Sequence, residues 1–539
     1  MSSGAKRVAL LVSILGSGVV FLDSTIVNVA LPAIRSSLHG ALSDEQWVVE
    51  AYLLTLSSLL LIGGSLGDLV GRRRVFAIGL TGFGAFSLVC AIAPSTDVLI
   101  GARAVQGVAG ALLVPSSLAL LIDVFEENER AAAIGSWTAW TGIVTVIGPL
   151  GGGALVQLAS WRWIFAVNLL PVAITLMLLR RLPSDTRSPG HVDVTGAVLC
   201  ALGLGGPVFA LIEQPQYGWG DVRVAVPLVA GLVMLAAFLA WERRSPQPMM
   251  PLQLFAVRNF AVGNLTTLAL YGGLSAAIFF LVLFIQQVGG YTPIEAGLAL
   301  LPITLMIFGL SRRFGSLADR LGPRLFMAGG PLVAGVGLLL LIRTGPGADY
   351  ATTILPGVLV FGLGMAATIA PLTATVLGSV DSRRSGLASG VNNAVARVAG
   401  LIAIAALGAV VSGSFQSRLD GDLGGRPLTG QARAAVAVAR HRPLVINVSG
   451  VPPAARPAVH AALVEASVHA FRIGIAIAAM LAIAGGLVAL VGIVNPQRAV
   501  RCADCPGGAL AGSSADGAQR VPATVRVARE TDMPVRSPG

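Results

Sequence analysis

The chain has 539 residues, of which 55% are hydrophobic and only 12% are charged, and its mean hydropathy is +0.81. A soluble domain carries about 25% charged residues, so a chain of this length and composition could not cover its surface with polar groups in water. The formal net charge is +11, but the charges stand in short clusters between apolar runs, which is typical of a membrane protein and argues against nucleic-acid binding. Of the 37 basic residues only Lys6 is a lysine, which excludes a phosphate-binding Gly-Lys-Ser/Thr loop or a Schiff-base lysine elsewhere.

Apolar runs long enough to span a bilayer, about 20 residues each, recur along the whole chain. The first extends from Val8 to Leu31 and is longer than the core of a signal peptide, so we interpret it as a transmembrane span. Further spans are predicted at residues 47–66, 75–93, 98–122, 132–159, 163–179, 194–212, 224–240, 260–287, 294–311, 325–342, 351–377, 386–412 and 473–494. The sequence therefore predicts an all-α membrane protein with 14 transmembrane helices.

The basic residues of the short loops predict the orientation. An even number of spans places both termini on one side of the membrane, and 18 arginines and lysines lie on that side against four on the other. Because cationic residues are retained in the cytoplasm, both termini are expected there, in a multi-pass protein of the cytoplasmic (inner) membrane. The long stretch 413–468 is then expected outside, as an outer loop.

One segment occurs twice. Gly64-Ser-Leu-Gly-Asp68-Leu-Val-Gly71-Arg72-Arg73 recurs as Gly315-Ser-Leu-Ala-Asp319-Arg320-Leu-Gly322-Pro-Arg324, both times on the cytoplasmic side after a span. Equal orientation predicts two parallel repeats, with a substrate site near the bilayer midplane between them. The copies lie eight spans apart where six are expected, so two spans are inserted between the halves. The predicted parts are an N-terminal six-helix half, a linker with two extra spans, a C-terminal six-helix half and a disordered cytoplasmic tail, at 1–181, 182–257, 258–495 and 496–539.

Several further motifs, together with the repeated loop, resemble those of one known family. They are Leu22-Asp23-Ser-Thr-Ile-Val-Asn28-Val-Ala-Leu-Pro32, Arg103-Ala-Val-Gln106-Gly107, Gly148-Pro149-Leu-Gly-Gly152-Gly153 and Trp161-Arg162-Trp-Ile-Phe165-x-x-Asn168. Over about residues 8–495 the chain resembles the major facilitator superfamily, specifically the fourteen-span drug:proton antiporters of the QacA/EmrB type. The resemblance implies the major facilitator fold, and it implies that Gly148, Pro149 and Gly152 form a hinge for antiport. Close packing of a membrane helix interface is the simpler explanation of these residues.

Asp23 and Arg103 are the candidate coupling residues. Asp23 lies about 22 Å along the helix from Val8, and a carboxylate inside a span is costly enough to suggest a function. We expect it to take up a proton or bind substrate. Arg103 stands five residues inside its predicted span, where it would hold a carboxylate charged and gate proton release, or form a fixed structural ion pair.

Glu50 is a second candidate carboxylate of the cavity. It lies near the predicted outer end of its span, beside Trp47, so it could instead reach the membrane interface. Arg397 lies near the middle of a later span and receives no predicted role. Cys502 and Cys505 have metal-ligand spacing, but two ligands do not complete a zinc site, so no metal or cofactor is predicted.

The resemblance further implies a cytoplasmic gate. Its candidate residues are Asp68, Arg72, Arg73, Asp123 and Asp319. Acidic side chains near helix N-termini and basic ones near C-termini are favoured by the helix dipole, and Asp68, Arg72 and Arg73 paired with Asp123 would latch the two halves together. Simple ordering of the loop is the alternative.

Three functions remain open. The first is proton-driven efflux of small hydrophobic or cationic compounds, such as drugs or antibiotics, by a monomer that binds a small-molecule substrate, protons and the lipid bilayer. The second is a proton-coupled importer or facilitator of a metabolite on the same fold. The third, a scaffold or sensor that transports nothing, is disfavoured by membrane-embedded charge and parallel repeats. No nucleophile–base pair suggests an enzyme.

Overall fold

The computed structural model describes residues 3–182, 192–381, 385–424, 426, 428–440, 442–448 and 450–495. These residues form helices and connecting turns, and no strand occurs among them. One compact unit comprises Met1–Val494. Residues 183–191 of the predicted linker 182–257, the predicted tail and the pair Cys502 and Cys505 lie outside the described residues.

The first half contains seven helices of the described chain, two of which share one predicted span. They are α1 (Ser3–Leu38), α2 (Leu42–Val70), α3 (Arg72–Ala91), α4 (Thr96–Val124), α5 (Glu127–Leu158), α6 (Trp163–Ala166) and α7 (Leu169–Leu179). Two inserted helices follow, α8 (Val194–Tyr217) and α9 (Val222–Arg244). The second half comprises η1 (Leu252–Ala256), α10 (Arg258–Gln287), α11 (Pro293–Leu321), α12 (Pro323–Leu341), η2 (Tyr350–Ile354), α13 (Leu355–Gly378), α14 (Ser385–Leu423), α15 (Gly430–Arg440) and α16 (Arg456–Gly492).

A helix occupies each position at which a span was predicted, but the count of 14 spans is not confirmed. Twelve helices of the described residues are long and apolar enough to cross a membrane. The other two predicted spans coincide with α2, which has 29 residues, and with the shorter apolar stretch Trp163–Leu179.

The repeated loop has the same backbone conformation in both halves. Gly71, between α2 and α3, has φ 113°, and Gly322, between α11 and α12, has φ 93°. Each glycine N–H donates to the carbonyl four residues earlier, at 3.0 Å to Gly67 and 2.9 Å to Ala318. A side chain would strain the backbone at these φ values, which explains why the motif carries glycine here in both copies.

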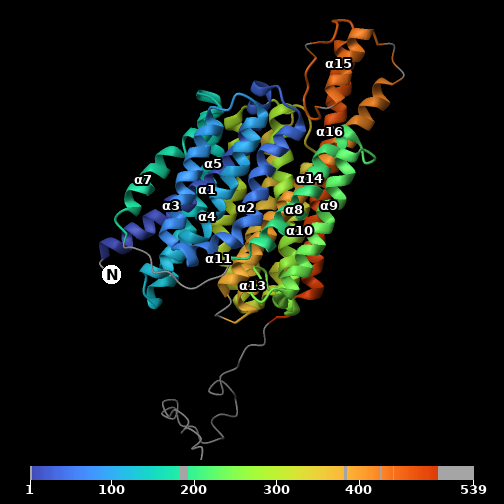
Figure 1. Ribbon diagram of the computed structural model, residues 1–539. Helices are drawn as coiled ribbons and strands as arrows, with labels where there is room; N and C mark the ends of the chain where they lie inside the picture. The colour runs from blue at the N-terminus through green and yellow to red at the C-terminus, as the bar shows by residue number, and fades with distance from the viewer. Residues whose placement is uncertain are drawn as a thin grey trace, which may run out of the picture. The chain divides into compact units, whose positions relative to one another are not determined.

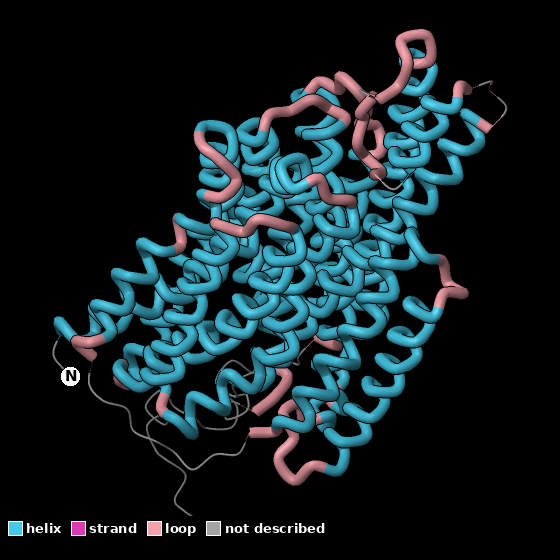
Figure 2. The backbone as a smooth tube through the Cα atoms, turned by 45° about the horizontal axis from the view of Figure 1, so that its top comes forward, coloured by secondary structure: helices cyan, strands magenta, loops and turns pink. Residues whose placement is uncertain are grey.

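The two halves touch mainly along two helix pairs, with smaller contacts of α1 to α10 and α11. α2 packs against α14, and α5 packs against α11, while the inserted α8 lies against both α2 and α14 and carries α9 on its other side. The helices run side by side and are joined mostly by short loops (Figure 2). The N-terminal residues and the end of α16 lie at the same end of the bundle (Figure 1), as the even number of spans requires.

The hydrophobic core is divided unevenly between the two ends of the bundle. One large cluster joins residues of both halves, among them Val29, Phe165, Phe284 and Phe361. A second cluster around Phe76 belongs to the first half alone, and a third around Phe260 belongs to the second half. Phe76 and Phe260 lie near the end of the bundle that holds the N-terminus, so at that end the halves do not share a core.

The stretch 413–468, predicted as an outer loop, is mostly helical. α14 continues through it to Leu423, α15 lies within it, and α16 begins at Arg456. This segment, named the outer cap after its predicted side of the membrane, stands at the end of the bundle opposite the N-terminus (Figure 1). Arg418 pairs with Glu465 across the cap, and Arg442 donates to the carbonyl of His39 at 3.3 Å. The hydropathy pattern missed these helices because the segment carries charges that end an apolar run.

Candidate functional site

Asp23 and Arg103 meet inside the first half. Asp23 is in the middle of α1 and fully buried, and Arg103, in the first third of α4, is 1% exposed. Arg103 Nη1 donates to Asp23 Oδ2 in a buried ion pair. A buried charge is tolerated when it is paired and hydrogen-bonded, and the pair satisfies this condition for both residues. The structure thus brings the two candidate coupling residues together, and their role, in gating proton release or as a fixed structural ion pair, stays a prediction.

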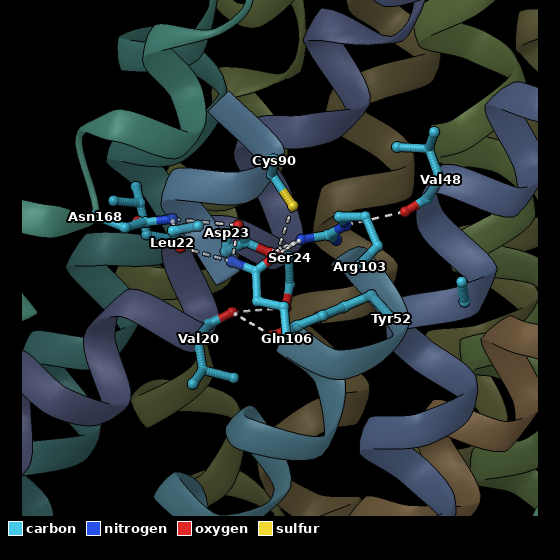
Figure 3. A network of polar contacts seen from close by, with 12 residues as sticks. Val20, Leu22, Asp23, Ser24, Val48, Tyr52, Cys90, Arg103, Gln106 and Asn168 are labelled. Atoms are coloured by element: carbon cyan, nitrogen blue, oxygen red, sulfur yellow. Dashed lines mark hydrogen bonds and ion pairs between the residues drawn. The ribbon is translucent and has the colours of Figure 1, made fainter. Parts of the chain in front are cut away.

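Two amides complete the shell of the Asp23 carboxylate. Gln106 Nε2 and Asn168 Nδ2 each donate to Asp23 Oδ1 at 3.2 Å (Figure 3). Gln106 also accepts from Arg103 Nη1 at 2.8 Å and donates to Ser87 Oγ at 2.8 Å. Three donors therefore reach the Asp23 carboxylate, and its two oxygens connect α1, α4 and the segment before α7.

Aromatic rings and a backbone carbonyl surround the guanidinium. Arg103 Nε donates to the carbonyl of Val48 at 3.0 Å, and its central carbon lies 4.1 Å from the ring centroid of Tyr52. Phe165 lies further away, at 5.7 Å. A cation over an aromatic face is stabilised by the ring quadrupole, so α2 gives Arg103 two contacts that do not involve Asp23.

Glu50 lies in α2 but does not join this network. It is fully buried, and neither carboxyl oxygen has a hydrogen-bond partner among the described residues. The expectation that it reaches the membrane interface is therefore wrong. Its neighbour one turn earlier, Gln46, donates to the carbonyl of Ile404 at 2.9 Å, so this side of α2 faces α14 of the other half. A carboxyl group that is buried without partners is far cheaper to keep neutral than charged.

The predicted gate residues are only partly brought together. Arg72 forms an ion pair with Asp123, and Arg73 donates to the carbonyl of Leu182 at 2.6 Å. Arg72 and Asp123 belong to α3 and α4 of the same half, so this pair does not connect the two halves. Asp319 is exposed in the last turn of α11. The side chain of Asp68 lies outside the described part of the chain, and the latch between the halves stays a prediction.

The glycines of α5 permit close helix packing. A Cβ on Gly148 would lie 2.1 Å from Thr25 Oγ1 of α1, and one on Gly152 would lie 2.5 Å from Ile26 Cγ1. A Cβ on Gly297 of α11 would lie 2.5 Å from the carbonyl oxygen of Pro149. α5 continues through Pro149 without a break. This stretch thus brings α5 against α1 and against the other half, and the hinge stays a prediction.

Comparison with known families identifies the fold. The sequence profile of the Major Facilitator Superfamily matches residues 13–404. The chain belongs to the Major Facilitator Superfamily. It is therefore a membrane transporter, as the motifs predicted.

Relatives within the superfamily are named for drug resistance and export. The chain is 38% identical to the puromycin resistance protein of Streptomyces alboniger, over 74% of this chain and 80% of that protein. It is 36% identical to the multidrug resistance protein Stp of Mycobacterium tuberculosis, over 75% and 76%. It is 34% identical to the tetracenomycin C resistance and export protein of Streptomyces glaucescens, over 75% of each chain.

Solved structures of the same fold are more distant in sequence. A bacterial homologue of the human lysosomal transporter Spinster, in an inward-facing conformation, has a TM-score of 0.66 at 16% identity, with 92% of this chain and all 100% of that chain covered. The xylose transporter XylE from E. coli has a TM-score of 0.55 at 12% identity, with 91% and 97% covered. At these identities the likeness concerns the fold alone.

Sequence reasoning named Gln106 and Asn168 only as parts of motifs and missed their role at the site. A signal was present for Gln106, because it lies three residues after Arg103 and residues i and i+3 share a helix face. Asn168 gave none, since its position beside Asp23 depends on how α7 packs. Gln106 and Asn168 supply two of the three hydrogen-bond donors that surround the Asp23 carboxylate.

Proposed function

We propose that this protein is a proton-driven exporter of small, largely apolar drug-like compounds. The observation that carries the proposal is the carboxylate of Asp23, buried inside the helix bundle and held by Arg103, Gln106 and Asn168. The printed names of the relatives, which include resistance and export proteins, support the direction and the class of substrate.

Protonation of Asp23 would change the network as follows. The neutral acid loses the ion pair with Arg103, while Arg103 keeps the carbonyl of Val48, the amide oxygen of Gln106 and the ring of Tyr52. Arg103 thus stays in place while α1 is released from α4. Return of the ion pair expels the proton, because a cation beside a carboxyl favours its charged form. α1 also packs against α10 of the other half, so its release can be transmitted across the interface.

The energy of one proton is adequate for this task. Moving one charge across 100 mV is worth about 2.3 kcal/mol, and each tenfold concentration ratio costs about 1.4 kcal/mol. One proton per cycle would sustain an export gradient of roughly a few tens to one.

The proposal includes the membrane orientation and the oligomeric state. The arginines of the short loops favour an orientation with both termini in the cytoplasm. The protein acts as a monomer built of the two halves and the inserted pair of helices. The core shared by both halves at the opposite end supports a conformation closed on the outside and separated toward the cytoplasm.

Proteoliposomes holding the purified full-length protein test the proposal. With the inside acidic, the wild-type protein should accumulate a fluorescent apolar drug in the inverted orientation, and a protonophore should release it. The variant Asp23→Asn should reconstitute equally and accumulate nothing above empty liposomes. Accumulation that ignores the protonophore, or that survives Asp23→Asn, would contradict proton coupling at this residue.

A proton-coupled importer remains the second candidate on the same fold. It is distinguished in the same liposomes, because an importer would move the compound with the proton and deplete it where the exporter accumulates it. The specific observation against it is that few polar side chains are available to bind a sugar-like metabolite. In α10 and α13 of the second half, Asn264, Thr267 and Thr368 bond to carbonyls of their own helices, and Thr266 bonds to Gly485 of α16.

A further inference from the structure

We propose that Arg397 of α14 binds a negatively charged group of the exported compound, a carboxylate or phenolate. The transport site would then select acidic compounds over permanent cations of the same shape. This inference rests on the proposed function, because it concerns the substrate of the same transport pathway. The substrate class expected from the sequence was hydrophobic or cationic, and this inference replaces the cationic compounds by acidic ones.

Arg397 is the isolated charge of the second half. It lies 12 residues after the start of α14 at Ser385, or about 18 Å along the helix. The other charged side chains of the described helices in that half lie toward the ends of the bundle or in the outer cap. They are Arg258, Glu295, Arg312, Arg313, Asp319, Arg320, Arg324, Arg418, Asp420, Asp422, Arg433, Arg440, Arg456, Glu465 and Arg472. No acidic residue stands at the depth of Arg397 in the second half.

The guanidinium of Arg397 has no counter-ion. Its Nε is buried without a hydrogen-bond partner, and no ion pair joins Arg397 to any residue in the described ranges. An arginine inside a membrane protein stays charged, and a buried charge requires a partner of opposite sign. The residue as a whole is only partly buried.

Arg397 faces the coupling site across the interface between the halves. Ile404 lies seven residues later, on the same face of α14, and its carbonyl accepts a hydrogen bond from Gln46 of α2 at 2.9 Å. This face of α14 therefore packs against α2, the helix whose Tyr52 ring contacts Arg103. Asp23 is already neutralised by Arg103, and Glu50 makes no hydrogen bond among the described residues. The uncompensated charge at this interface is therefore positive, and the missing partner is an anion.

The helix face that carries Arg397 points away from lipid. Asn393 lies four residues earlier on the same face and is exposed. Ile402, which is 41% exposed, lies nine residues after Asn393, and at about 100° per residue that is the opposite side of the helix. An exposed amide and an unpaired guanidinium opposite an apolar outer face mark this side of α14 as the one that meets substrate.

Binding of three matched probes tests the assignment. Pyrenebutyric acid, pyrenebutanol and pyrenebutylamine share one aromatic body and differ only in charge, and their fluorescence reports binding to the purified full-length protein in detergent near neutral pH. The wild-type protein should bind the acid at least about tenfold more tightly than the amine, as expected for a charge-assisted hydrogen bond in a partly buried site. The alcohol should lie between them.

The variants then assign the preference to one side chain. Arg397→Gln should remove the preference for the acid and leave the binding of the alcohol within about twofold, and Arg397→Lys should keep part of it. The control is Arg343→Gln, which removes one charge from an exposed position and should change nothing. Thermal unfolding of each variant in the same detergent shows whether it is folded.

Three results would overturn the inference. They are equal binding of acid and amine by the wild-type protein, a preference that survives Arg397→Gln, and equal loss of all three probes in a folded Arg397→Gln variant. Glu50 could be the true partner in another conformation, and restored export in the charge-swapped pair Glu50→Arg with Arg397→Glu would show this and refute a substrate anion. Since binding is measured without a proton gradient, selective binding without proton-driven transport would contradict the proposed function alone.

Discussion

Arg103 Nη1 reaches two acceptors at once, Asp23 Oδ2 and, at 2.8 Å, Gln106 Oε1. The same Gln106 donates to the other oxygen of Asp23 at 3.2 Å. The three side chains thus form a closed ring of hydrogen bonds that spans 80 residues of sequence between α1 and α4. Loss of Arg103 therefore leaves the Asp23 carboxylate buried without a counter-ion, whereas Arg103 keeps the Val48 carbonyl, Gln106 and the Tyr52 ring when Asp23 is neutral.

This ring predicts a specific pattern in a double-mutant cycle. Arg103→Gln alone leaves a buried carboxylate unpaired and should destabilise the protein by about 3–5 kcal/mol. Adding Asp23→Asn removes that charge and should recover most of the loss. Thermal unfolding in detergent measures each step, and additive losses in the double variant would mean that the two residues act independently.

Removing the carboxyl group of Glu50 should make the protein more stable but less active in export. Replacing it by leucine removes two unsatisfied buried oxygens and should stabilise the protein by about 1–3 kcal/mol. Drug export should fall if Glu50 carries a proton during the cycle. The control is Leu53→Ile, at a partly buried position three residues after Glu50. This change should leave export unchanged. A destabilised Glu50→Leu variant would instead reveal a charged partner.

The contact between α5 and α11 should control the outer closure. A Cβ on Gly153 would lie 2.5 Å from the carbonyl oxygen of Pro293, which is backbone and cannot move aside, so Gly153→Ala should push the two halves apart at this end. Overpacking of this kind costs about 1–3 kcal/mol. Spin labels on the two halves should show a longer outer distance. Gly142→Ala, where no atom lies within 4 Å, should leave the distance unchanged.

The repeated loop should matter for transport more than for folding. Asp68→Asn should reduce export while the protein remains at normal abundance in the membrane. Arg72→Gln breaks the ion pair with Asp123, which is partly exposed, and should cost at most about 1 kcal/mol. Export assays and membrane immunoblots of both variants separate the effects, and undiminished export in Asp68→Asn would reduce the loop to a structural connector.

The topology is testable with reporters that are active on one side only. A reporter fused after Gly421, in the part of α14 that enters the outer cap, should read outside. A reporter fused after Gly512 should read cytoplasmic. The predicted topology places one span, α16, between the two fusion points. Both reporters on one side of the membrane would therefore contradict it.

Much of the fold was predictable because it depends on local chain properties. A long run of apolar residues has only the helix as a solution in lipid, so hydropathy located α1, α10 and α16 from the sequence. Glycine at positive φ is equally local, and the two copies of the loop at Gly71 and Gly322 predicted parallel repeats. The outer cap was missed for the same reason, since its amphipathic and charged helices carry no membrane signal.

The class of protein, the order of its spans and the presence of Asp23, Glu50, Arg103 and Arg397 inside them could be read from the amino-acid sequence. The partners of these charged side chains could be found only once the helices were packed together. Asn168 reaches Asp23 across 145 residues of sequence, Glu50 is buried without a partner, and Arg72 binds Asp123 within one half. Helix formation in lipid follows from each segment's own composition, whereas the partner of a charge depends on which helix faces are packed together.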